Sequence, residues 1–370
     1  MYWIPILAIG SYLLFSDTDE KKDNKKKRKR NNKKMANCNG LILNYSNNLN
    51  ISKKKKNKLK DSKDFLRGKI RDYFKKHHPD YIPEFYIQGS YKMKTTILTK
   101  DNECDLDDGV YFKRDIGVTG TTLQKWVKKA LKDITSIPTE HRKKCVRVRY
   151  KAEYHIDFPI YYFPDDSEYP LLAVKDEDLQ ESDPKELVEW YNWEKDKEGQ
   201  LNRIVRYLKG WGDNKRNKMP NGLAMTILVA ENIQYNDRDD IALKKTLIKI
   251  QKTLDENFEC IVPATPYDDL FEDYDSIRMN NFLDNLDSFV DDATEAVENE
   301  SNQIKASRLW RKHLGDKFPL GQDVDMDAKE ASLRKTSKTI LSGSAYSQKD
   351  GSISDNSSGV KNKTHTNFGG

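Results

Sequence analysis

Two closely spaced aspartates are the first residues of this sequence that are suited to chemistry. Asp105 and Asp107 are separated by one residue in ECDLDDGVYF, whose alternating pattern and aromatic end predict a strand over residues 103–112. Because side chains alternate across a strand, both carboxylates would lie on one face. Like charges so close together repel, and a bound divalent cation relieves the repulsion. Mg²⁺ prefers oxygen ligands and leaves room for substrate phosphates. The alternative for this pair alone is a solvated acidic turn.

A third aspartate strengthens the metal interpretation. Asp157 interrupts the otherwise apolar segment HIDFPIYYF, where an unpaired charge is costly. If this strand lies beside the 103–112 strand, the three carboxylates meet. Three carboxylates can hold two metal ions, which together stabilise the attacking and leaving oxygens of phosphoryl transfer.

A Gly-Ser turn precedes the aspartates. In EFYIQGSYKMKTTI, Gly89 and Ser90 stand between a short apolar strand and the expected start of a helix. Backbone N–H groups and a serine hydroxyl at such a turn suit phosphate oxygens, although an ordinary turn has the same sequence. The order of the three features is more specific than any one of them. Asp105 follows Ser90 by 15 residues, and Asp157 follows Asp107 by 50.

The surrounding pattern predicts the elements that position these residues. Apolar residues at helical spacing from Ser62 to Pro79, a helix over 121–133 and strands over 145–150 and 154–163 indicate a mixed sheet with helices against it. From Ser182 the chain reads as helices up to residue 315. We therefore expect four regions: an N-terminal extension (1–34), a sheet-containing lobe (35–180) that begins with an extended arm (35–60), a helical lobe (181–324) and a disordered tail (325–370).

Composition limits the class of protein. The chain has 370 residues and a net charge of +6, and all of that excess lies in residues 1–34. Residues 35–370 carry no net charge, which argues against a dedicated nucleic-acid-binding protein whose whole surface contacts phosphates. The four cysteines form no CxxC pair, which indicates a reducing compartment and disfavours a His/Cys metal site.

Residues 1–34 allow two interpretations. Residues 1–15 are uncharged and mostly apolar, but they are shorter than the span of about 20 residues that crosses a membrane. A basic run follows them, as it would after a short anchor with a cytoplasmic flank. The other interpretation, which we favour, is that translation starts at Met35 and that the upstream residues are a gene-model artefact.

The motifs together resemble the polymerase-β-like nucleotidyltransferases. More closely, they resemble the cGAS/DncV-like bacterial synthases (CD-NTases) that make cyclic oligonucleotides in CBASS anti-phage defence, and the DncV-like branch in particular. The resemblance covers about residues 40–315, and it implies an α+β fold, in which a mixed sheet is flanked by helices and a helical second lobe completes the nucleotide cleft. The matching stretches are QGSYKMKTTI, CDLDDGVYF, HIDFPIYYFP, SDPKELVEWYN and IVRYLKGWGD.

The resemblance assigns roles to the three aspartates and the turn. Asp105 and Asp107 would ligate two Mg²⁺ or Mn²⁺ ions. Asp157 would ligate the catalytic ion and help to deprotonate the attacking ribose hydroxyl. The donor triphosphate would be held by Ser90 and its neighbours Gln88 and Gly89.

Further nucleotide contacts are implied outside the turn. Lys209 matches a phosphate-contacting lysine and lies on the polar face of its helix, where a solvated lysine is the alternative. Arg147 is a candidate nucleotide contact whose match needs a one-residue gap. The family's serine near the nucleotide falls around Asn221–Ala224, where this chain has none, so base recognition stays open.

The resemblance also gives the tail a role. In related operons an E1/E2-like enzyme joins the C-terminal glycine of the synthase to targets, and this chain ends in Gly370. The alternative is an ordinary frayed terminus.

The implied function is cytoplasmic synthesis of a 3′,3′-cyclic dinucleotide, cyclic GMP-AMP, from ATP and GTP with release of pyrophosphate. A downstream effector would read the product. No DNA activator is expected, because the zinc-binding His/Cys cluster of the animal relatives is missing from this sequence. Two alternatives are a template-independent RNA nucleotidyltransferase and a non-enzymatic membrane-associated protein that uses residues 1–60. Base identity, ring size, activation signal, effector and oligomeric state stay open.

Overall fold

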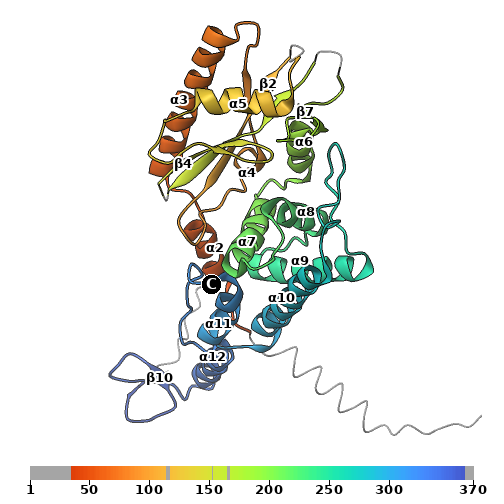
Figure 1. Ribbon diagram of the computed structural model, residues 1–370. Helices are drawn as coiled ribbons and strands as arrows, with labels where there is room; N and C mark the ends of the chain where they lie inside the picture. The colour runs from red at the N-terminus through yellow and green to blue at the C-terminus, as the bar shows by residue number, and fades with distance from the viewer. Residues whose placement is uncertain (1–34, 114–116, 152, 165–166, 363–370) are drawn as a thin grey trace, which may run out of the picture. The chain divides into compact units, whose positions relative to one another are not determined.

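The computed structural model describes residues 35–113, 117–151, 153–164 and 167–362. Residues Asn37–Asp323 form one compact unit, and the remaining described residues belong to a second unit. The first unit contains a sheet covered by helices and a group of further helices (Figure 1). No helix among the described residues is long and apolar enough to cross a membrane. The α+β architecture expected from the sequence is confirmed.

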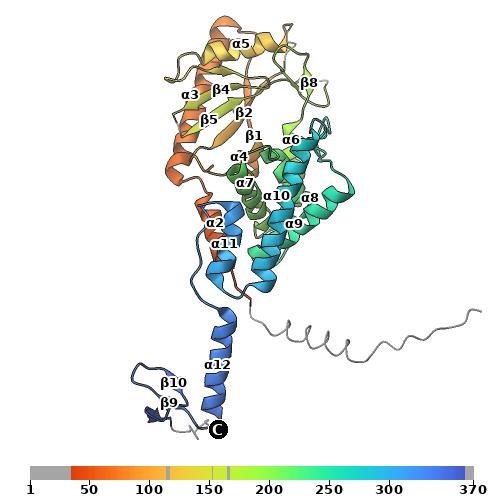
Figure 2. The same ribbon diagram turned by 60° about the horizontal axis from the view of Figure 1, so that its bottom comes forward.

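Strand β2 (Asp105–Phe112) is the centre of the sheet. On one side it pairs antiparallel with β1 (Glu84–Gln88). It also pairs in parallel with β5 (Tyr154–Phe158) and then with β6 (Ile160–Tyr162), which are separated by Pro159. Figure 2 shows β4, β5 and β2 side by side. The outer strands are β3 (Glu140–His141), β4 (Val146–Tyr150), β7 (Leu171–Leu172) and β8 (Gln180–Glu181).

Helices α3 (Lys53–His77) and α5 (Gly120–Ala130) cover the sheet. Ser52 caps α3 by accepting a hydrogen bond from the Lys55 amide. The apolar stripe of α3, which includes Leu66 and Phe74, is buried in one core with β2 and β5. Burial of this stripe, rather than helix propensity, therefore holds α3 on the strand that carries Asp105 and Asp107.

The helical part surrounds α7 (Gln200–Lys215), whose buried face contains the predicted stripe from Leu201 to Trp211. In Figure 2, α9 and α10 lie side by side, with α10 continuing into a short π-helix, η1. The other helices of this part are α2 (Asn39–Asn48), α6 (Pro184–Glu194), α8 (Gly222–Asn232), α9 (Asp239–Glu256), α10 (Ser276–Thr294), η1 (Glu295–Asn299) and α11 (Gln303–Leu314).

Two expectations are wrong. Residues 35–60 are not an extended arm, because 39–48 form α2 and α3 already begins at Lys53. Ile42 and Tyr45 of α2 are buried, so tertiary packing forms a helix that the Asn- and Lys-rich composition hides.

The predicted disorder of the tail is also wrong for residues 326–361. They form α12 (Met326–Leu341) and a small sheet of β9 (Tyr346–Ser347), β10 (Ile353–Ser354) and β11 (Val360–Lys361). The α12 sequence is rich in Ala, Leu, Lys and Arg, which favour helix even where few apolar groups are buried. Residues 1–34 and Gly370 lie outside the described residues.

One buried ion pair ties α3 to the central strand. The Asp108 side chain is fully buried and accepts two hydrogen bonds from the Arg67 guanidinium, one of them from Nε at 2.7 Å. Burial raises the pKa of Asp108, and the Arg67 charge opposes that rise. Asp108 is the neighbour of Asp107, so this pair helps to hold the strand in its register.

We predict that Arg67→Met lowers the free energy of unfolding by about 3 kcal/mol, because it leaves a buried carboxylate without a partner. The double variant Arg67→Met/Asp108→Leu should recover most of this loss. Urea titrations would measure both, with Lys69→Met, an exposed change on the same helix, as the control. Equal effects of Arg67→Met and Lys69→Met would contradict the role of the pair.

Candidate active site

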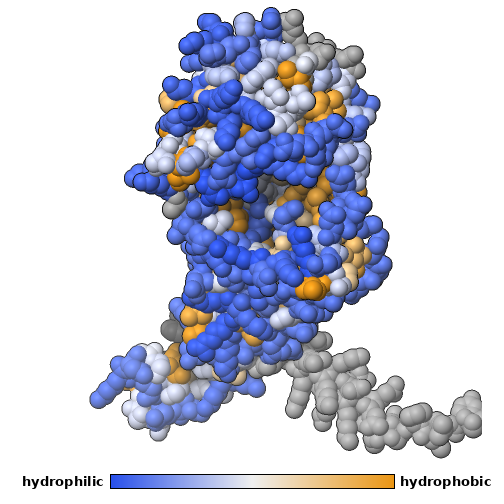
Figure 3. Space-filling view, in the orientation of Figure 1, coloured by the Kyte–Doolittle hydropathy of each residue, from blue (hydrophilic) through white to orange (hydrophobic). Residues whose placement is uncertain are grey.

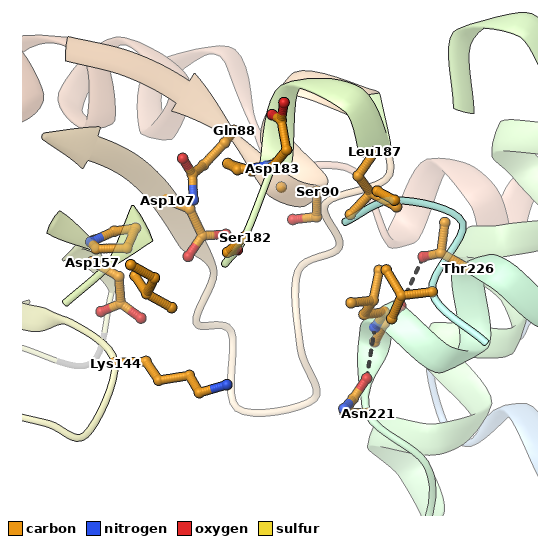
Figure 4. Close-up of a pocket in the computed structure, with 18 of the residues that line it drawn as sticks. Gln88, Ser90, Asp107, Lys144, Asp157, Ser182, Asp183, Leu187, Asn221 and Thr226 are labelled. Carbon is orange, nitrogen blue, oxygen red and sulfur yellow. Dashed lines mark hydrogen bonds between the residues drawn. The ribbon is translucent and has the colours of Figure 1, made fainter. Parts of the chain in front are cut away.

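The sheet brings the three predicted aspartates to one place. Asp107 of β2 lies in register with Asp157 of the parallel neighbour β5, and Asp105 lies opposite His155. All three aspartates line the same cavity, and Figure 4 shows Asp107 and Asp157 on the same side of it. The expectation that the strand of Asp157 lies beside that of Asp105 and Asp107 is confirmed.

The electrostatics of the cluster centre on Asp107. Burial and the charges of Asp105 and Asp157 together raise the pKa of Asp107 to about 8, while Lys209 and Arg147 oppose the rise. Burial also lowers the pKa of Lys209, against the effect of Asp105 and Asp107. The three carboxylates therefore do not all carry a charge at neutral pH, and a bound cation would favour their charged forms.

Arg147 is placed differently from the expectation. It lies opposite Asp157 on the antiparallel strand β4, and its Nε and Nη2 each donate to the Asp157 carboxylate at 2.6 Å. It is not among the residues that line the cavity. Its guanidinium pairs with Asp157, and its role as a nucleotide contact stays a prediction.

The donor set fits a divalent cation in its chemistry. The carboxylates of Asp105 and Asp107 are oxygen ligands of the kind that Mg²⁺ takes. Among the described residues, no three His, Cys, Asp or Glu side chains are gathered as a metal site. A cation that reached Asp157 would have to compete with the Arg147 guanidinium.

The Gly-Ser turn lies against the aspartates. Gly89 opens the short helix α4 (Gly89–Met93) with a left-handed φ of 60°. A Cβ atom at position 89 would meet the Asp107 carboxylate, so both the backbone angle and the space require glycine. Ser90 lines the cavity, and its Oγ is 3.0 Å from Oγ1 of Thr96.

Gln88 and Lys209 occupy the wall beside the turn. The buried Gln88 amide donates to Tyr161 at 2.9 Å and accepts from Tyr111 at 3.2 Å, so it supports the turn from behind. Lys209 lines the cavity from α7, and its Nζ donates to the Thr95 carbonyl at 3.1 Å.

The cavity itself has a volume of about 570 Å³ and is lined by the sheet and the helical part together. Figure 3 shows this region of the surface hollowed between the two parts. Sequence reasoning missed several polar lining residues, namely Lys144, Ser182, Asp183, Asn221 and Thr226. Ser182 and Asp183 begin one of the stretches that carry the resemblance, and the family serine falls near position 221, but neither signal gave these residues a role. The Asn221 side chain caps α8 by accepting from the amides of Leu223 and Ala224, each at 2.9 Å.

Fold and site together define a polymerase-β-like nucleotidyltransferase. Comparison with known proteins narrows the class. Residues 83–161 match the model of the cyclic GMP-AMP synthase DncV-like nucleotidyltransferase domain. The segment 83–161 is therefore similar to the nucleotidyltransferase domain of the DncV-like synthases.

Two relatives by sequence differ in their named products. A cyclic GMP-AMP synthase of Escherichia albertii is 31% identical over 219 residues, which are 54% of this chain and 47% of the relative. The chain thus spans about half the length of that relative. A cyclic AMP-AMP-AMP synthase of an Acinetobacter species is 23% identical over 272 residues, 68% of this chain and 76% of the relative.

Solved structures agree on the fold. Vibrio cholerae DncV in complex with a linear intermediate, pppA(3′,5′)pG, matches with a TM-score of 0.66 at 19% identity, over 78% of this chain and all of that one. Escherichia coli DncV bound to 3′-deoxy GTP matches with a TM-score of 0.61 at 19% identity, over 73% and 93% of the two chains.

We predict that Asp107→Asn stabilises the metal-free protein at pH 7 by about 1–3 kcal/mol. The raised pKa means that the folded state holds a proton that the unfolded state has lost. The stability of the unsubstituted protein should therefore fall as pH rises from about 4 to about 8.

Thermal melts in EDTA between pH 4 and 8 would measure the difference, which should vanish near pH 4. Asp176→Asn, at an exposed aspartate, is the matched control. An Asp107→Asn protein that is less stable at pH 7, or a difference independent of pH, would be evidence against the crowded carboxylates.

Proposed function

We propose that this chain is a cyclic oligonucleotide synthase that uses nucleoside triphosphates. The observation that carries the proposal is the register of Asp107 with Asp157, which puts Asp105, Asp107 and Asp157 on the same cavity as Ser90 and Lys209. In the proposed reaction a ribose 3′-hydroxyl attacks the α-phosphorus of a triphosphate. The new P–O bond replaces the bond to pyrophosphate, which leaves, and the hydroxyl proton goes to a base. A second such step closes the ring.

The residues of the chain supply mainly positioning and charge in this reaction. Ser90 and the backbone of the turn would hold the donor phosphates, while Lys209 offers a cation to the same phosphates from the helical part. Asp157 would accept the proton of the attacking hydroxyl after its carboxylate is released from Arg147. Two divalent ions, Mg²⁺ or Mn²⁺, held by Asp105, Asp107 and Asp157, would supply neutralisation of the developing phosphoryl charge.

We infer that the product is 3′,3′-cyclic GMP-AMP, made from ATP and GTP. Support comes from the E. albertii relative, which is named as a cyclic GMP-AMP synthase and is more similar in sequence than the AMP-AMP-AMP synthase. We further propose a role in anti-phage signalling, with an effector that binds the product. Conjugation of Gly370 by an E1/E2-like enzyme stays a prediction.

The first test is the product. Full-length protein incubated with Mg²⁺ and radiolabelled ATP and GTP should give a phosphatase-resistant small product that needs both nucleotides. Asp105→Ala/Asp107→Ala should lower its formation by at least about 10³-fold, whereas Asp133→Ala/Asp176→Ala, at exposed aspartates outside the cavity lining, should retain it.

Other products would contradict specific parts of the proposal. A product from ATP alone would overturn the cyclic GMP-AMP assignment, and a phosphatase-sensitive ladder would favour the RNA nucleotidyltransferase. Full product formation by the Asp105→Ala/Asp107→Ala protein would overturn the proposed site.

Lys209 gives a second prediction. Lys209→Met should raise the KM for the donor triphosphate by about tenfold, with a smaller effect on kcat, because the lost contact is made to the bound phosphates before the reaction. Steady-state kinetics would measure the split, with Lys215→Met on the same helix as the control. An unchanged KM would place Lys209 outside the phosphate contacts.

A further inference from the structure

A second cavity, of about 600 Å³, shares no lining residue with the first. It lies between the start of α3, the turn helix α4 and helix α7. Its lining residues are Asn50, Ile51, Lys56, Ile87, Tyr91, Lys92, Lys94, Thr96, Gly199, Asn202, Arg203 and Arg206. Five of these are basic, and none of the lining residues that the structure describes is acidic.

Most of this positive charge is not neutralised. Arg203 forms an ion pair with Asp239, with its Nε 2.6 Å from the carboxylate. For Lys56, Lys92, Lys94 and Arg206, the described part of the chain offers no carboxylate within ion-pair distance. A ligand with several negative charges would therefore meet cations that are already assembled.

Arg206 is held in place by neutral groups. Its Nη2 donates to the Ser46 hydroxyl at 2.7 Å, its Nε donates to the Asn202 carbonyl at 3.3 Å, and its Nη1 donates to the side chain of Asn50. These acceptors fix the guanidinium without cancelling its charge. An arginine held in this way is suited to phosphate, whose oxygens accept paired N–H bonds.

The rest of the lining suits an apolar or aromatic group. Ile51 is buried, and Ile87 and Tyr91 are half-buried beside the basic residues. Tyr91 is the aromatic side chain among the lining residues. A ligand that combines phosphates with a ring would use both kinds of surface.

We propose that this cavity binds a small phosphorylated ligand with an aromatic part, of the chemical class of the nucleoside polyphosphates, at a site separate from the aspartates. A side-chain contact connects the second cavity to the proposed catalytic turn. Thr96 lines the second cavity, and its Oγ1 is 3.0 Å from Oγ of Ser90, which lines the first. Tyr91 and Lys92 follow Ser90 within α4. The ligand would therefore act as a regulator of the turn.

The two sites differ in their need for metal, which allows a clean test. In EDTA the three aspartates repel a polyphosphate from the first cavity, whereas the second cavity needs no cation to accept it. Isothermal titration of the full chain in EDTA with inorganic tripolyphosphate and with ATP should show one equivalent bound, and ATP should bind more tightly because of its ring.

Two double variants with the same change in net charge test the role of the basic lining residues. Lys92→Glu/Lys94→Glu should weaken binding of both probes by about tenfold or more, because two attractive charges become repulsive. Lys75→Glu/Lys76→Glu, exposed at the end of α3, makes the same change in net charge outside the cavity and should alter binding by less than about twofold. Equal weakening by the two pairs, or no binding of either probe, would overturn the proposal. Tighter binding of a 20-base-pair DNA duplex than of ATP would also overturn it in favour of a nucleic acid.

Hydrogen exchange would locate the ligand. ATP in EDTA should slow exchange of the amides of residues 50–56 and 199–206, which contain lining residues of the second cavity and none of the first, in the unsubstituted protein and not in Lys92→Glu/Lys94→Glu. Protection confined to residues 89–90, 105–107 and 157 would instead place ATP in the first cavity and contradict a second site. None of these readouts needs turnover, so an inactive protein that passes them would refute only the proposed function.

Discussion

Repulsion among carboxylates is the constraint around which this structure is organised. Parallel pairing of β2 with β5 puts Asp107 in register with Asp157, while strand alternation puts Asp105 on the same face as Asp107. A sheet built only for stability would avoid this arrangement, because burial raises the pKa of Asp107 to about 8. The Arg147 guanidinium on β4 and the Lys209 amine on α7 each offset part of the negative charge of the aspartates. A bound cation could interact with the carboxylate charge that these two side chains do not offset.

The residues of the candidate site come from both parts of the compact unit. The sheet supplies the aspartates and the turn, and α7 supplies Lys209, whose amine is tied to the carbonyl of Thr95 just after the turn. Gly89 allows the turn to approach Asp107 so closely that no side chain fits between them. A substrate phosphate in this cavity would therefore lie within reach of the turn, the carboxylates and the lysine at once, which is the positioning that phosphoryl transfer needs.

Local pattern was enough to predict the strands and the shared face of Asp105 and Asp107, because alternation depends only on neighbouring residues. The place of Asp157 needed the additional assumption that its strand lies beside β2, which the topology confirms. The pairing of Arg147 with Asp157 was not predicted, because the two residues stand opposite each other on antiparallel strands and no local pattern reveals which residue stands opposite. Helix α2 was missed because buried Ile42 and Tyr45 stabilise it through distant contacts. Lys144 was missed because a lysine in a loop gives no signal until the fold brings it to the cavity.

Divalent cations should bind to the crowded carboxylates together with a nucleotide. Electron paramagnetic resonance of Mn²⁺, titrated into the full chain with and without a non-hydrolysable ATP analogue, would measure this binding. We predict saturable binding that reaches two Mn²⁺ per chain when the analogue is present, and that is lost in Asp105→Asn/Asp107→Asn. A spectrum that remains the spectrum of free Mn²⁺, or Mn²⁺ binding that is unchanged in that variant, would contradict metal binding by these carboxylates.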